Sequence, residues 1–102
     1  MPYRVFIRPA AEEDLRNLYD YIAEKAGRSV AGRYVERIEA ECMKLADFPE
    51  RGTMRNEIFP GLRVIGFERR AAIAFVVEHE AVRILRILYG GQAFPEDWSQ
   101  FN

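Results

Sequence analysis

The chain has 102 residues, of which 49% are hydrophobic and 30% charged, and this composition is typical of one soluble globular domain. Its 15 basic and 16 acidic residues leave a net charge of -1, which argues against holding nucleic acid by overall charge; we predict no direct sequence-specific nucleic-acid binding. The single Cys42 excludes an internal disulfide, and no long apolar run or signal segment opens the chain. We therefore expect a single cytoplasmic domain, residues 1–102, that makes no membrane contact.

The first half of the sequence predicts a strand followed by two helices. Residues 3–8 alternate in character, which is typical of a short strand, and Pro9 ends it. Acidic residues follow the proline, so a helix is expected from Ala10 to Ala26, ended by Gly27. Ser29 is expected to cap a second helix that runs to Pro49. The short turn between them predicts an antiparallel helix hairpin over about residues 9–48.

Each predicted helix carries one apolar stripe that should face the core. The stripe of the first helix is Leu15, Leu18, Tyr19 and Ile22, and that of the second is Val30, Tyr34, Ile38, Cys42 and Leu45.

The second half of the sequence predicts a sheet. Residues 48–61 contain two prolines and two glycines and should form a loop. Residues 62–67, 71–77 and 82–89 are rich in valine, isoleucine and phenylalanine, with charged turns between them, and predict an antiparallel meander. The fold class expected is α+β in the order β-α-α-β-β-β, with the helix hairpin packed on the sheet and a tail over residues 90–102.

Candidate catalytic groups are few. His79 stands between two glutamates in a predicted turn, where a solvated side chain is expected, and Cys42 lies on a buried stripe. Ser29 and Ser99 have no partnering histidine. The sequence also lacks the glycine-rich nucleotide motifs and the H-E-x-x-H zinc motif, so we expect no cofactor, no metal and no catalytic residue.

Arginine is the one chemical feature that stands out. There are 13 arginines, and residues 51–86 carry seven of them against four glutamates, a local net charge of +3. In the last predicted strand, alternation places Arg86 on a face with apolar neighbours, where a guanidinium needs a partner. Two interpretations stay open: an internal ion pair with Asp14 or Glu57, or a groove that receives an acidic peptide or a phosphate.

Four sequence stretches, in order and with matching spacing, resemble the RelE/ParE superfamily of type II toxin-antitoxin toxins, and more specifically its ParE-like branch. They are residues 8–15 (RPAAEEDL) with 21–23 (YIA), 45–49 (LADFP) with 51–52 (RG), 60–63 (PGLR), and 82–90 (VRILRILYG). The resemblance covers about residues 3–92 and implies a small α+β toxin that a ParD-like antitoxin keeps inactive. ParE-like members are associated with poisoning of DNA gyrase, which makes gyrase binding without covalent chemistry the expected activity.

Two alternatives accompany that expectation. A RelE-like toxin would be a metal-independent, ribosome-dependent mRNA endonuclease, but residues 90–93 read Gly-Gly-Gln-Ala here instead of a basic run. The other alternative is a non-toxic relic that only binds antitoxin. It is motivated by Phe75 and Val76, which stand where many ParE members have Tyr-Arg, and by Tyr89, which stands where many have histidine.

We predict that the antitoxin contacts Tyr19, Ile22, Tyr34, Arg63, Phe75 and Arg86, and that the target contacts Arg63, Arg70, Arg86 and Tyr89.

Overall fold

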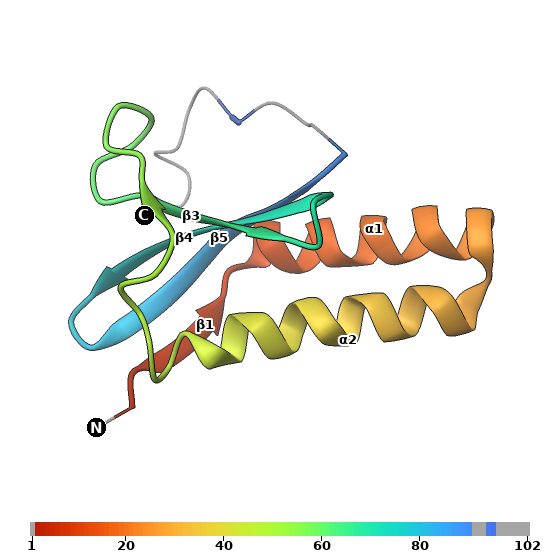
Figure 1. The fold of residues 1–102 in the computed structure, drawn as a ribbon, viewed down its shortest axis with the longest axis horizontal. Coiled ribbons are helices and arrows are strands. Elements are labelled where there is room, and N and C mark those ends of the chain that lie inside the picture. The colour runs from red at the N-terminus through yellow and green to blue at the C-terminus, as the bar shows by residue number, and fades with distance from the viewer. Residues whose placement is uncertain (1, 91–93, 96–102) are drawn as a thin grey trace.

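The computed structural model describes residues 2–90 and 94–95, and it shows two helices packed on one face of a five-stranded sheet (Figure 1). The elements are β1 (Arg4–Ile7), α1 (Pro9–Ala26), α2 (Arg28–Lys44), β2 (Thr53–Met54), β3 (Arg63–Phe67), β4 (Ala71–Glu78) and β5 (Ala81–Tyr89). The α+β class and the packing of the hairpin on the sheet are confirmed. Neither helix within the described ranges is long and apolar enough to cross a membrane.

The helix hairpin turns at a single glycine. Gly27 adopts a φ of +98°, which favours glycine, and its N–H donates to the Ala23 carbonyl at 2.9 Å. The same residue precedes the first residue of α2, so Ser29 already lies inside the helix and the prediction that it caps α2 was wrong. The helix also ends at Lys44, five residues before Pro49. Ala31, and not the exposed Val30, begins the buried stripe of α2, so the prediction that Val30 faces the core was wrong.

The strand order is β1-β5-β4-β3-β2, with β1 parallel to β5 and the other pairs antiparallel. The predicted meander of β3, β4 and β5 is confirmed, whereas the two-residue β2 lies in the segment expected to be a loop. Gly52 explains why this segment can pair: a Cβ there would lie 2.5 Å from the Val64 carbonyl oxygen, so only glycine lets the chain cross β3 so closely.

A β-bulge in β5 changes the face on which its second half lies. Ala74 pairs with Arg86 and Phe75 pairs with Ile84, which leaves Leu85 as an extra residue between them. Strict alternation would separate Ile87 from Ile84, yet both belong to the core beneath the helices. Alternation predicts Arg86 on the face of Ile84 and Ile87 on the other, and this prediction was therefore wrong beyond Ile84.

The apolar side chains form two clusters, one on each face of the sheet. The larger lies between the sheet and both helices and includes the fully buried Ile38, Ile73 and Phe75. The smaller is formed by Leu62, Ala74 and Leu85 on the opposite face, where residues 58–59 and 94 pack over it. The helices thus close one face, while a loop and Phe94 close part of the other.

Candidate protein-interaction site

The part-buried arginine of β5 is held by an acidic residue of α1. Arg86 Nε donates to Asp14 Oδ2 at 2.7 Å and Arg86 Nη2 donates to Asp14 Oδ1 at 2.8 Å, a two-pronged pair. Asp14 Oδ2 also accepts the Ile87 N–H at 2.8 Å, at the edge of β5 beyond its pairing with β1. The hydrogen bonds that Arg86 donates to Asp14 raise the pKa of Arg86, against an opposing effect of burial. The internal ion pair is the alternative that the structure confirms, with Asp14 as the partner; Glu57 pairs with Arg55 at 2.6 Å instead.

Tyrosines line a groove beside this ion pair. The groove has a volume of about 540 Å³ and is bordered by Asp14, Asn17, Leu18, Tyr21, Arg70, Ile87, Tyr89 and Gly90. The rings of Tyr21 and Tyr89 meet edge to face at 6.0 Å, and Tyr34 continues the row at 5.9 Å from Tyr89. Two of the predicted target contacts, Arg70 and Tyr89, therefore share one concave site.

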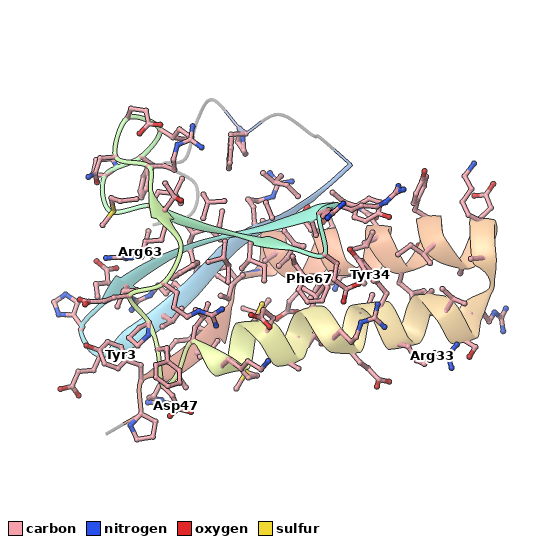
Figure 2. The ribbon with its side chains drawn as sticks, viewed as in Figure 1. Tyr3, Arg33, Tyr34, Asp47, Arg63 and Phe67 are labelled. Atoms are coloured by element: carbon pink, nitrogen blue, oxygen red, sulfur yellow. The ribbon has the colours of Figure 1, made fainter. Side chains whose placement is uncertain are left out.

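Tyr34 joins this row to the core of the sheet. Figure 2 shows its ring reaching from α2 to Phe67 of β3, and the two ring centres are 5.7 Å apart. Its hydroxyl is buried without a hydrogen-bond partner in the described part of the chain, and burial is the largest of the effects that raise its pKa. Arg37 lies over the ring at 5.3 Å and pairs with Glu68 at 2.8 Å, which ties α2 to the β3–β4 turn. Tyr34 is thus a structural link whose side chain is half-buried.

A second groove, of about 400 Å³, runs over the helix hairpin. Its apolar walls are Ile7, Leu15, Tyr19 and Val35, and its charged rim consists of Glu12, Arg16 and Glu39. An open apolar channel with charged edges is the shape that an amphipathic segment fits. Of the predicted antitoxin contacts, Tyr19 lines this groove.

The remaining predicted residues lie elsewhere. Ile22 is only 8% exposed and Phe75 is completely buried, so neither side chain offers a partner much surface in this conformation. Arg63 stands at the start of β3, beside the loop in Figure 2, and donates to the Arg51 carbonyl at 3.5 Å. Arg63 pairs with Phe75 of β4, which in turn pairs with Ile84 of β5. Tyr89 lies five residues further along β5, which is roughly 15 Å along the strand from Ile84. The four predicted target contacts do not converge on one point.

Comparison with known proteins identifies the family. Residues 5–94 match the model of the ParE toxin of the type II toxin-antitoxin system, parDE. The chain is also 34% identical to Toxin ParE3 of Caulobacter vibrioides over 77 residues, which cover 76% of each protein. The chain belongs to the ParE toxin family.

Solved structures agree with the assignment of this chain to the ParE toxin family. A chain of the chromosomal ParDE toxin-antitoxin system from P. aeruginosa matches with a TM-score of 0.76 and 26% identity, over 85% of this chain and 95% of that one. A chain of the RelBE2 toxin-antitoxin complex from Mycobacterium tuberculosis matches with a TM-score of 0.64 and 18% identity, over 87% and 99%. At that identity the second match supports the shared fold.

Two arginines of the ParE-family toxin escaped the sequence reasoning. Arg8 and Arg83 line a pocket on the sheet face opposite the helices. Alternation over residues 3–8 places Arg8 on the same side as Arg4 and Phe6, but only the non-local pairing of β1 with β5 brings Arg83 onto the same face. Within the described residues no three histidine, cysteine, aspartate or glutamate side chains gather as metal ligands.

Proposed function

We propose that a ParD-type antitoxin neutralises this toxin by laying an amphipathic segment in the groove of the helix hairpin. The ParDE and RelBE2 structures that the chain resembles are toxin-antitoxin systems by their own descriptions. The groove supplies an apolar floor at Leu15, Tyr19 and Val35, with both signs of charge on its rim. A segment that folds on binding would cover this floor and extend toward Arg63 with acidic residues.

We further propose that the free toxin acts in the cytoplasm by binding a protein, DNA gyrase, without cutting a covalent bond. The observation that supports this most is the commitment of Arg86 to Asp14, because a phosphodiester-cleaving site needs cations free to face the scissile phosphate. Arg63 lies at the other end of the sheet and cannot join Arg70 and Tyr89 around one phosphate. Surface recognition requires no such convergence.

A supercoiling assay tests the proposal. Purified toxin added to gyrase and relaxed plasmid should abolish supercoiling, and a ParD-type antitoxin mixed with the toxin beforehand should prevent this loss. Arg70→Ala should weaken the inhibition, whereas Arg33→Ala should not, because Arg33 points into solvent from the outer side of α2 (Figure 2). Full supercoiling at a large excess of folded toxin would contradict gyrase as the target.

The endonuclease alternative is favoured by one observation, the shared groove of Arg70 and Tyr89. Primer extension on translated mRNA, minutes after induction of the toxin, would then show cuts at codon positions. Growth arrest without cleavage would reject this alternative, and harmless overproduction of the folded chain would instead favour a relic that only binds antitoxin.

A further inference from the structure

The sheet face opposite the helices carries a pocket that the proposed function does not use. It has a volume of about 390 Å³, and we call it the Arg8 pocket. It is lined by Arg8, Arg83, Glu78, Val76, Val77, Leu85 and residues 59–61. Most of this lining comes from the segment 59–61 on one side and from the last residues of β4 and the first half of β5 on the other.

The sheet register explains why two arginines meet there. Phe6 of β1 pairs with Arg83, and Arg83 pairs with Val76 of β4, so these three residues form one row across the face. Arg8 is two residues beyond Phe6, so its side chain lies on the same face of the sheet as that of Phe6. The guanidinium groups of neighbouring strands therefore border a single space.

The two arginines differ in how they are satisfied. Arg83 Nη1 pairs with Glu78 Oε1 at 3.1 Å. Arg8 Nε is buried and has no hydrogen-bond partner within the described structure. A buried donor without an acceptor is unfavourable, and a ligand oxygen that reached it would remove that penalty. Two arginines and one glutamate give the lining one net positive charge.

We propose that the Arg8 pocket binds the carboxylate of an acidic side chain on the protein that the toxin inhibits. This inference rests on the proposed function, because it assumes a protein target. One positive charge matches a carboxylate, whereas the nearby Glu78 carboxylate repels a phosphate dianion. The apolar walls at Phe59, Val76 and Leu85 suit the methylene groups of a glutamate. The volume of about 390 Å³ is sufficient to admit a glutamate side chain.

Titration of the full ¹⁵N-labelled toxin with small probes tests the site without any target protein. An amidated Gly-Glu-Gly peptide with an acetylated N-terminus should shift the Arg8 Nε–H signal and the amides of residues 59–61 and 85, saturating in the millimolar range expected of one carboxylate contact. The Gly-Gln-Gly peptide should leave these signals in place. Saturation by inorganic phosphate at lower concentration than by the glutamyl peptide, or no saturable shift with any probe, would overturn the proposal.

Matched variants separate recognition from folding. Arg8→Lys keeps the charge but loses Nε, and should weaken glutamyl-peptide binding about tenfold. Glu78→Gln removes the competing carboxylate and should tighten binding about threefold, while Arg33→Gln should change nothing. A thermal melt of each variant shows that it is folded. Equal affinity of folded Arg8→Lys and wild type would refute the role of Arg8.

The gyrase assay then distinguishes this inference from the proposed function. If the wild type inhibits supercoiling and folded Arg8→Lys needs about tenfold more protein for the same inhibition, the pocket contributes to target binding. If both inhibit equally, the pocket inference fails while the gyrase proposal stands. If the wild type does not inhibit, the gyrase proposal fails, and the peptide titration still decides whether the pocket binds a carboxylate.

Discussion

The helix-covered face of the sheet is closed by large side chains with no exposed surface, among them Ile38, Ile73 and Phe75, whereas the opposite face is closed by a small cluster around Leu62 and Leu85. Arginines border the second face, and one of them keeps a buried donor unpaired within the described structure. Close packing makes the first face the source of stability. The second face bears fewer apolar side chains, and its unpaired donor, Arg8 Nε, belongs to a residue that lines a pocket, whereas the unpaired Tyr34 hydroxyl of the first face sits among packed aromatic rings. An unpaired group beside a pocket is where recognition of a polar side chain is expected.

Adjacent residues of β4 give the largest test of this difference. Phe75→Ala empties the core below the helices and should cost about 3–5 kcal/mol of unfolding free energy. Val76→Ala, on the opposite face of the same strand and only half-buried, should cost about 1 kcal/mol. Urea denaturation followed by circular dichroism measures both. Equal losses at the two positions would contradict the claim that the faces differ.

The lone cysteine tests how dry the helix-covered side is. Cys42 has no exposed surface, and burial raises its pKa to about 12 from an ordinary 9.0. The native thiolate fraction at pH 8 should therefore be about a thousandfold lower than in the unfolded chain. Ellman's reagent should react at once in urea and extremely slowly in buffer. Rapid reaction of the native protein would mean that the space beneath α2 opens readily.

The link between α1 and β5 is expected to matter less than the core but more than a surface pair. Asp14→Asn loses the charge that faces Arg86 and should cost about 2 kcal/mol, because a part-buried guanidinium is left short of its partner. Asp20→Asn, on the exposed side of the same helix, is the control and should be neutral. If both variants unfold at the wild-type urea concentration, the ion pair contributes nothing to stability.

The order of elements could be predicted from the sequence because it depends on local signals. Pro9 and Gly27 set the ends of α1, and the change from helical to alternating periodicity marks the sheet. The parallel pairing of β1 with β5 could not, since it joins segments that lie far apart in the sequence. The bulge at Leu85 was also missed, because apolar residues lie on both faces of β5 and an extra residue there does not disturb a polar–apolar alternation.

The candidate site was less predictable for the same reason. Arg86 drew attention as a charge among apolar residues, and that signal correctly required a partner, which the fold supplies as Asp14. Phe75 was placed on an interaction surface although its ring is fully buried. Arg8 looked like the last residue of a short strand, and only the register with β5 turns it into part of a pocket. Pairing between distant segments decides which polar residues meet.

The smallest expected effect concerns the pair that fixes the β3–β4 turn to α2. The hydrogen bond from Arg37 lowers the pKa of Glu68, so this interaction stabilises the fold at neutral pH and is lost as the pH falls from the ordinary value of 4.5 through the lowered one. Glu68→Gln should be slightly less stable than wild type at pH 7, and the difference should shrink as the pH falls through that window. Glu24→Gln, an exposed change on α1, should show no such pH dependence. Thermal melts at low and high salt measure the effect, which added NaCl should reduce because both side chains are exposed. If the difference in stability between Glu68→Gln and wild type stayed constant as the pH fell, the substitution would perturb the turn by some means other than the lost charge.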